Sequence, residues 1–267
     1  MRIKDLGELT GNLLLFGGVY SNLYALDALI AHAEETGIPP KNAICTGDIV
    51  AYCADAAGSV AHIRNWGCPV LKGNCEAQLA EDAPDCGCGY EEGSQCSLLS
   101  RGWYAHARKT VSPEAKVWMG QLPDRIVFRH NGLRYAVVHG GASDISKFLW
   151  PTTSEEVLRS EISVLEGEIC VVDRVVSGHS GVSFQAEVDG VTWINAGAIG
   201  LPDNSGRSQT SYVIVSGKSI ENKLLSYNTK AQVEAMRRAG LTQGYHETLS
   251  SGHWPSEDTL PPEMRRA

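Results

Sequence analysis

Short apolar runs and helix-like spacings alternate along the first part of the chain. Residues 13–16 form an apolar run that ends at two glycines, which predicts a buried strand. Residues 22–35 repeat leucine and isoleucine at helical spacing, and the following Gly-Ile-Pro-Pro stretch predicts the end of that helix. Two more strands are predicted at residues 43–45 and 69–71, around a helix at residues 59–65. This alternation indicates a parallel sheet covered by helices.

Residues from about 80 to 100 interrupt the pattern with acidic, glycine-containing sequence that holds three cysteines, so we expect an excursion from the sheet. Beyond it, Ser112-Pro113 is typical of a helix start, and Asp189-Gly190 predicts a tight hairpin. Further strands are predicted at residues 125–128, 135–138, 171–176, 184–188, 192–194, 212–215 and 220–227, and helices at 103–108 and 230–239. We expect a single domain over residues 1–267, with an irregular tail from about 254.

Composition narrows the class of protein. The chain has 267 residues, 43% of them hydrophobic, and a formal net charge of −8 with a pI near 5.5. That charge argues against a nucleic-acid groove or an anionic membrane surface as the partner. No apolar run is long enough to cross a bilayer and no signal peptide is evident. The eight cysteines in an α/β pattern are typical of reduced thiols in a cytoplasmic enzyme, which would act on a small molecule. The oligomeric state stays open.

Candidate chemistry lies in four segments that each follow an apolar run. They are Gly47-Asp48, Gly73-Asn74-Cys75-Glu76, His139-Gly140-Gly141 and Gly178-His179-Ser180-Gly181. Because each would lie at the carboxyl end of a strand, their polar side chains are expected at one edge of the sheet. We therefore predict that a divalent cation is held by Asp48, Asn74, His139 and His179.

The order and spacing of these segments resemble the calcineurin-like metallophosphoesterase superfamily, within it the small bacterial phosphodiesterase-like branch. The family's blocks are Asp-x-His, Gly-Asp, Gly-Asn-His-Asp/Glu, a lone His-Gly and Gly-His-x-His. The resemblance runs from about Leu13 to Leu241, and residues 195–200 are similar to the family's closing Asn-Pro-Gly-Ser-x-Gly. It implies a four-layer α/β/β/α sandwich that carries two metal ions at the carboxyl edge of its sheets and hydrolyses phosphate esters.

The resemblance also implies which ligands are missing. It implies that the Asp48 carboxylate bridges the two ions and that Asn74, His139 and His179 bind the second ion. The first ion's ligands are replaced by Gly18, Tyr20 and Gly181, and the histidine that acts on the leaving group is replaced by Cys75. Three arrangements stay open: one ion in the second position, a rearranged pair built partly from cysteines, or a binding relic without metal.

Three functions follow from these arrangements. The first is hydrolysis of a small phosphate mono- or diester with Mn, Fe or Zn as the divalent metal. The second is a metalloenzyme with an iron–tyrosinate at Tyr20 that acts on a sulfur-containing or redox substrate. The third is a non-catalytic binding module.

Further residues complete the predicted site. Cys75 and Tyr20 are candidate catalytic groups, although each could equally be a packing residue. Candidate substrate-binding residues are Asn22, Gly140 and Gly181. A thiolate cluster is one interpretation of Cys86, Cys88 and Cys96, and a flexible, reduced cysteine loop is the other. Trp103-Tyr104 and Trp150-Pro151 are candidate walls of the cleft, although core packing explains them equally well.

Overall fold

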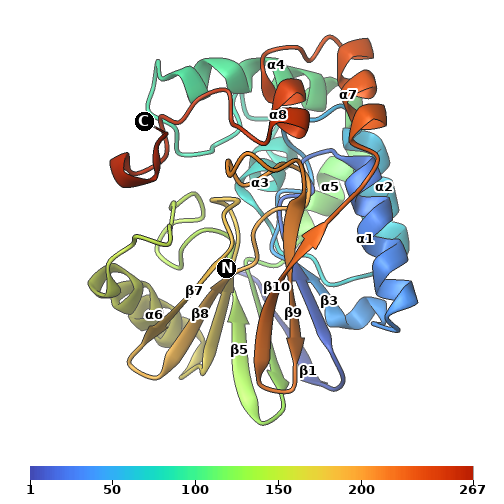
Figure 1. The fold of residues 1–267 in the computed structure, drawn as a ribbon. Coiled ribbons are helices and arrows are strands. Elements are labelled where there is room, and N and C mark those ends of the chain that lie inside the picture. Colours follow the sequence, from blue (N-terminus) through green and yellow to red (C-terminus); the bar gives the residue numbers. More distant parts are fainter. Residues whose placement is uncertain (267) are drawn as a thin grey trace.

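The computed structural model describes residues 1–266, which form two β-sheets enclosed by helices (Figure 1). The strands are β1 (Ile3–Leu9), β2 (Leu13–Phe16), β3 (Ala43–Cys45), β4 (Arg125–His130), β5 (Leu133–Val137), β6 (Arg174–Ser177), β7 (Phe184–Val188), β8 (Val191–Asn195), β9 (Thr210–Ser216) and β10 (Ser219–Leu225). One sheet has six strands in the order β1-β4-β5-β6-β8-β7, and the other has four in the order β10-β9-β2-β3.

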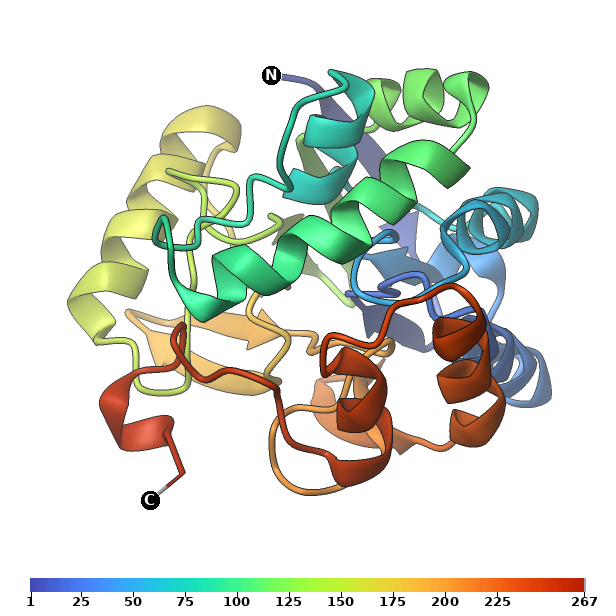
Figure 2. The same ribbon diagram turned by 90° about the horizontal axis from the view of Figure 1, so that it is seen from above.

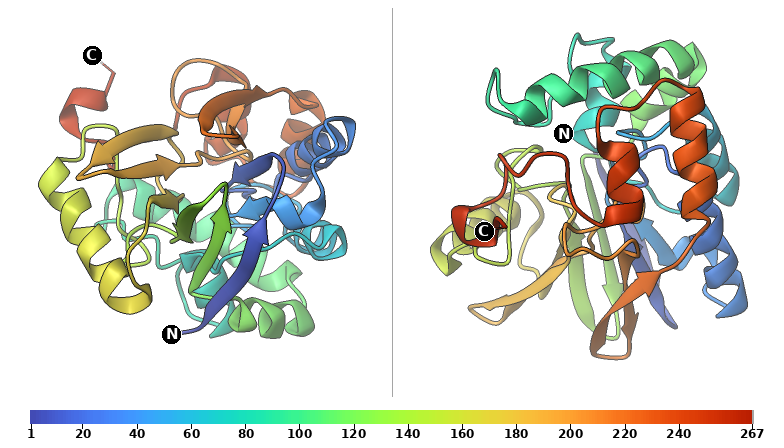
Figure 3. Two further views of the ribbon diagram at one scale, coloured as in Figure 1. Left: turned by 90° about the horizontal axis from the view of Figure 1, so that it is seen from below. Right: turned by 45° about the horizontal axis from the view of Figure 1, so that its top comes forward.

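Helices cover the outer faces of both sheets. They are α1 (Leu23–Glu35), α2 (Ala56–Trp66), α3 (Asn74–Ala80), α4 (Gln95–Thr110), α5 (Pro113–Gln121), α6 (Glu155–Ile169), α7 (Thr229–Arg238) and α8 (Tyr245–Ser251), with 3-10 turns η1 (Pro40–Asn42) and η2 (Pro262–Met264). Seen from below, α6 flanks one side of the paired sheets, while α1 and α2 flank the other (Figure 3, left). No helix within residues 1–266 combines the length and the apolarity needed to cross a bilayer.

The side-chain alternation of β2 shows why the layers form. Leu13 and Leu15 belong to the core between the two sheets, whereas Leu14 and Phe16 belong to the core beneath the helices. Successive residues of a strand point to opposite faces, so a fully apolar strand must be covered on both sides. All four side chains are fully buried, each stabilising the fold by about 1.5–3 kcal/mol. The predicted four-layer α/β/β/α sandwich is confirmed.

Some local predictions are corrected by the structure. The parallel pairing predicted for the first strands is confirmed for β2 and β3, but β9 joins them antiparallel, and β1 and β4–β8 form a separate mixed sheet. Residues 69–71 contribute only an isolated bridge between Cys45 and Val70, and the strand predicted from 171 begins at Arg174. The helix α6 and the edge strand β1 were not predicted. The hairpin at Asp189-Gly190 is confirmed by the antiparallel pairing of β7 and β8.

The carboxyl ends of β2, β3, β5 and β6 meet at one edge, which is the upper edge in Figure 1. Figure 2 looks down on this edge, with α4, α8 and the C-terminal segment lying around it. Three side chains at this edge come from left-handed backbone, with φ of 53° at Tyr20, 56° at Asp48 and 63° at His179. Non-glycine residues adopt that conformation at a cost, and such strain concentrates at functional sites.

Candidate metal centre

The four predicted ligand residues meet at the carboxyl edge. The Nε2 atom of His139 lies 3.0 Å from Asn74 Oδ1, 3.2 Å from Asp48 Oδ2 and 3.2 Å from His179 Nδ1. Asp48, His139 and His179 also place ligand atoms within 4.8 Å of one another, and no other such trio of His, Cys, Asp or Glu occurs within residues 1–266. All four side chains are buried. Residues separated by more than a hundred positions in sequence are thus brought to a single point.

The hydrogen bonds of His139 indicate which of its ring nitrogens could bind a cation. Its Nδ1 lies 2.7 Å from the Thr46 carbonyl oxygen, which can only accept, so Nδ1 carries a proton. In the neutral ring Nε2 then carries a lone pair, which faces the amide oxygen of Asn74, a carboxylate oxygen of Asp48 and an imidazole nitrogen of His179. Lone pairs that converge in this way need protons or a cation between them. Nitrogen and oxygen donors of this type suit Mn²⁺, Fe²⁺ or Zn²⁺.

The amide of Asn74 is oriented by the loop that follows α3. Its Nδ2 donates to the Cys86 carbonyl oxygen at 2.9 Å and lies 3.4 Å from Cys88 Sγ and 3.5 Å from Cys75 Sγ. Since the amide nitrogen is engaged there, the amide oxygen faces His139 and the other ligand atoms. The loop residues therefore select the atom of Asn74 that faces the ion site.

Glu76, for which no role was predicted, connects two of the turns at the candidate centre. Its carboxylate is fully buried and accepts from the backbone N–H groups of Asp48 at 2.8 Å, Gly73 at 3.0 Å and Ile49 at 2.9 Å. These bonds join the turn after β3 to the start of α3, which carry Asp48 and Asn74. The signal was an acidic residue two places after Asn74, in the first turn of a short helix.

The pKa values of the two acidic groups at the centre, Asp48 and Glu76, are shifted in opposite directions. Burial alone would raise the pKa of Asp48, but the charge of His139 and hydrogen bonds with His139 and His179 outweigh burial and lower it. For Glu76, burial and then the charge of Asp48 raise the pKa to about 7. Asp48 is therefore the permanently charged carboxylate of the centre.

The two histidines also differ. Burial lowers the pKa of His179, which prepares its Nδ1 to act as a neutral ligand. For His139 burial acts in the same direction, but the charge of Asp48, hydrogen bonds with Asp48 and Thr46 and the charge of Glu76 together outweigh burial and raise the pKa. A proton on His139 would therefore compete with a cation at this point.

Tyr20 fills the space where the resemblance would place the first ion. A Cβ on Gly18 would lie 2.5 Å from the Tyr20 ring, and a Cβ on Gly181 would lie 3.5 Å from its hydroxyl. The ring is 4% exposed, and its hydroxyl donates a long bond of 3.4 Å to the His179 carbonyl oxygen. Burial, and then the charge of Asp48, raise the pKa of Tyr20 well above its ordinary value, so the phenol keeps its proton. These contacts are those of a space-filling residue.

Cys75 resembles Tyr20 in its surroundings. Its thiol is buried, and burial together with the charge of Asp48 raises its pKa well above the ordinary value. Its backbone N–H donates to Asp48 Oδ1 at 3.3 Å, while its sulfur lies against the Asn74 amide. The residue therefore supports two ligand side chains as a neutral thiol.

The predicted substrate-binding residues lie in different places. Asn22 is fully buried as the N-cap of α1, with Nδ2 donating to the Gly200 carbonyl oxygen at 2.9 Å and Oδ1 accepting from Ala25. Gly140 packs directly against the backbone of residues 145–147. Of the three, Gly181 alone lines the cleft described below.

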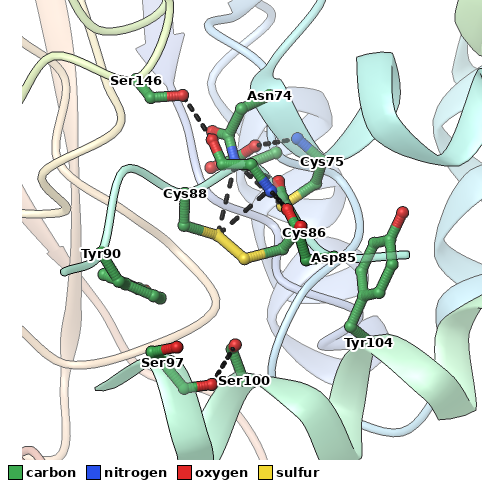
Figure 4. The surroundings of a disulfide bond; sticks show 12 residues. Asn74, Cys75, Asp85, Cys86, Cys88, Tyr90, Ser97, Ser100, Tyr104 and Ser146 are labelled. Atoms are coloured by element: carbon green, nitrogen blue, oxygen red, sulfur yellow. Dashed lines mark hydrogen bonds between the residues drawn. A yellow bond between two sulfur atoms is a disulfide. The ribbon is translucent and has the colours of Figure 1, made fainter. Parts of the chain in front are cut away.

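The cysteine loop is organised differently from both sequence interpretations. Cys86 and Cys88 are joined by a disulfide bond, so the expectation of reduced thiols is wrong at these two positions. Cys96 is buried at the start of α4 as a free thiol. A cluster of three thiolates is therefore corrected to one disulfide and one separate thiol. Figure 4 shows the hydrogen bonds from the Asn74 amide to Cys86 and Cys88, with Tyr90 near the disulfide.

A cleft opens beside His179, one of the predicted ligand residues. The cleft has a volume of about 40 Å³, and its walls are largely aromatic. The lining residues are Tyr20, Tyr52, Tyr90, Cys96, Phe148, Trp150, His179, Ser180, Gly181, Ala198, Leu201, Pro202, Tyr245, Trp254, Ser256 and Thr259. Trp150 is thus a wall residue, as predicted, whereas Trp103 and Tyr104 belong to the core beneath the helices.

Comparison with known proteins agrees with this architecture. A model of the calcineurin-like phosphoesterase superfamily domain matches residues 14–219. The chain is 24% identical over 254 residues to an uncharacterized protein of Methanocaldococcus jannaschii, covering 88% of this chain and 95% of that protein. Its fold resembles a metallophosphoesterase from Sphaerobacter thermophilus with a TM-score of 0.71, at 19% identity over 91% of this chain and 100% of the other. It also resembles a hypothetical protein from Pyrococcus horikoshii, with a TM-score of 0.75 at 13% identity, over 93% and 99% of the two chains.

Proposed function

Because this chain belongs to the calcineurin-like phosphoesterase superfamily, we propose that it is a hydrolase of a small phosphate ester with a single-ion centre. The ion would be held by Asp48, Asn74, His139 and His179. The observation that carries the proposal is the convergence of an amide oxygen, a carboxylate oxygen and an imidazole nitrogen on His139 Nε2, within 3.2 Å. A protein without a cation would have little reason to bury such a set.

The reduced number of ions follows from the contacts of Tyr20. Its ring fills the space that the resemblance gives to the first ion, and its protonated hydroxyl is directed at a carbonyl oxygen. These contacts favour one ion over a rearranged pair, and they give no support to an iron–tyrosinate.

The residues would divide the work as follows. A bound divalent cation would supply positive charge to a phosphoryl group and promote attack by water. Thr46 fixes the tautomer of His139 through its carbonyl oxygen, and Glu76 holds the turn that carries Asp48. Cys75, as a neutral thiol, supports Asn74 and is a positioning residue in this proposal. Tyr20 excludes water from the space beside the ion.

The proposal is tested by metal analysis together with hydrolysis. The purified protein is loaded with Mn²⁺, Fe²⁺ or Zn²⁺ and assayed with p-nitrophenyl phosphate and bis(p-nitrophenyl) phosphate. We expect one equivalent of metal and measurable hydrolysis with at least one ion. Asp48→Asn removes the charged ligand at nearly constant size, so metal content should collapse and the rate should fall by roughly 100-fold.

Asp82→Asn is the matched control. Asp82 also has a positive φ, of 53°, but it lies on the surface in ion pairs with Arg108 and Lys116. This variant should keep both the metal and the rate. Full metal occupancy without hydrolysis of either ester would refute the catalytic proposal, and retention of metal by Asp48→Asn would refute the assigned centre.

A further inference from the structure

A second pocket lies between helix α4 and the loop that carries the Cys86–Cys88 disulfide. It has a volume of about 430 Å³, and both cysteines line it together with Ser97 and Ser100 of α4. Figure 4 shows the two sulfur atoms on the side of the loop that faces these serines. Because Cys86 and Cys88 are only 3% and 6% exposed, the pocket gives a small molecule its approach to them.

The disulfide contributes little to the stability of the fold. Its two cysteines are separated by Gly87 alone. A disulfide stabilises a protein chiefly by closing a loop in the unfolded chain, and the effect grows with the length of that loop. A ring that encloses one intervening residue therefore has little structural purpose. Two bonded sulfur atoms beside a pocket are, by contrast, a group that a thiolate can attack.

The two sulfur atoms have different surroundings. Asn74 Nδ2 lies 3.4 Å from Cys88 Sγ and can donate to it. At Cys86 the same amide donates to the carbonyl oxygen and not to the sulfur, at 2.9 Å. A donor stabilises the negative charge that develops on a sulfur atom when an S–S bond breaks. Cys88 is therefore favoured as the sulfur that leaves, and Cys86 as the sulfur that is attacked.

The charges at the pocket restrict the molecule that would enter it. Arg101 of α4 supplies a cation, and Asp85 and Glu92 supply carboxylates. All three side chains are exposed, so each favours a matching ligand only modestly. A lining that carries both signs of charge suits a thiol that bears both a carboxylate and an ammonium group, as free cysteine does.

We propose that Cys86–Cys88 is a thiol–disulfide exchange site for a small zwitterionic thiol. The thiolate of the small molecule attacks Cys86 Sγ, the S–S bond breaks, and the electron pair leaves with Cys88 Sγ, which takes a proton from water. A second thiolate attacks the small molecule's sulfur in the mixed disulfide, and Cys86 leaves and is protonated in turn. The protein disulfide gains two electrons, and two small thiols are oxidised to their disulfide.

Exchange at this site also reaches the candidate metal centre. The Cys86 carbonyl oxygen accepts from Asn74, and the Gly87 carbonyl oxygen accepts from Ser146 in the loop after β5. Reduction opens the ring between these two contacts, so the Asn74 amide is held less firmly and the affinity for a cation should fall several-fold. That consequence rests on the proposed function, whereas the exchange reaction needs neither metal nor ester.

The test uses the full chain with Cys170→Ser, because Cys170 is an exposed free thiol that would react by itself. The protein is mixed with cysteine without added metal, quenched with N-ethylmaleimide and mapped by peptide mass spectrometry. We expect a transient adduct with cysteine on Cys86 and N-ethylmaleimide on Cys88, followed by loss of the disulfide. Addition of cystine to the reduced protein should restore the disulfide.

The choice of thiol is tested with cysteamine, which lacks the carboxylate of cysteine but has a thiol of similar acidity. In Arg101→Gln the ratio of the cysteine rate to the cysteamine rate should fall by about threefold. Arg237→Gln changes an exposed arginine on α7, outside the pocket, and should leave the ratio unchanged.

Every readout is the mass of the cysteine peptides or its rate of change, so the result does not depend on whether the protein hydrolyses an ester. A disulfide that cysteine opens only in urea, or a folded protein whose two thiols cystine does not oxidise, would overturn the exchange site. An equal rate ratio in Arg101→Gln and Arg237→Gln would overturn the assignment of a zwitterionic thiol.

Discussion

Replacement of Tyr20 by phenylalanine and by alanine distinguishes a space-filling ring from a metal-binding phenol. Tyr20→Phe removes only the hydroxyl, whose bond to the His179 carbonyl oxygen is 3.4 Å long and therefore weak. The expected loss is about 1 kcal/mol or less in the free energy of unfolding. Tyr20→Ala removes a ring that is 4% exposed and packs edge-on against Tyr52 at 4.8 Å. Truncation of a buried aromatic side chain costs about 3–5 kcal/mol.

Thermal unfolding and metal analysis measure the two effects separately. For a chain of this size, 3–5 kcal/mol corresponds to a fall of about 10 °C in Tm, while Tyr20→Phe should shift Tm by no more than about 4 °C. Metal content and metal affinity should be unchanged in Tyr20→Phe. Tyr24, which is half-buried on α1, provides matched Phe and Ala controls. The reasoning is refuted if Tyr20→Phe loses metal or a visible absorption band while its Tm stays constant.

Three further predictions concern the groups around the ligands. Glu76→Gln leaves some of the backbone N–H groups that bond to Glu76 without an acceptor. Metal affinity, measured by titration, should fall by about tenfold. The free energy of unfolding, measured by thermal unfolding, should fall by about 1–3 kcal/mol. Because the pKa of His139 is raised, its proton stabilises the metal-free fold below about pH 6.5, and this contribution is lost as pH rises through the folded-state pKa. Metal affinity should therefore increase with pH over that interval. A metal affinity that does not change with pH in a competition assay would contradict this. Reduction of the Cys86–Cys88 disulfide by a phosphine should lower metal affinity several-fold, and Cys86→Ser/Cys88→Ser should lower it similarly and be insensitive to the reductant.

The convergence of the four candidate ligand residues was predictable because each follows an apolar run, although the run before Asn74 forms only an isolated bridge. Parallel strands present their carboxyl ends at one edge of a sheet, which predicts that His139 and His179 lie together after β5 and β6. Asp48 follows β3 in the other sheet, so its place beside them was implied by the family resemblance and not by the strand pattern. The role of Glu76 was not predictable, since it depends on backbone N–H groups from two separate turns. The contacts of Tyr90 with Phe148 and of Trp150 with Trp254 could not be predicted either, because they join loops whose paths no periodicity describes. The same reason explains why the Cys86–Cys88 bond was not expected.

The glycine at position 18 and the tyrosine at position 20 depend on each other. Gly18 has φ of 48°, and a Cβ there would lie 2.5 Å from the Tyr20 ring and 2.7 Å from the Ala198 Cβ. An aspartate at position 18 is therefore incompatible with Tyr20, even though aspartate tolerates a positive φ. Conversely, a smaller residue at position 20 would leave a buried space beside a single ion. Recovery of the first ion of the family's pair would consequently require simultaneous changes at positions 18, 20 and 181, together with room at Ala198. Packing as well as the loss of ligands therefore favours the proposed single-ion centre.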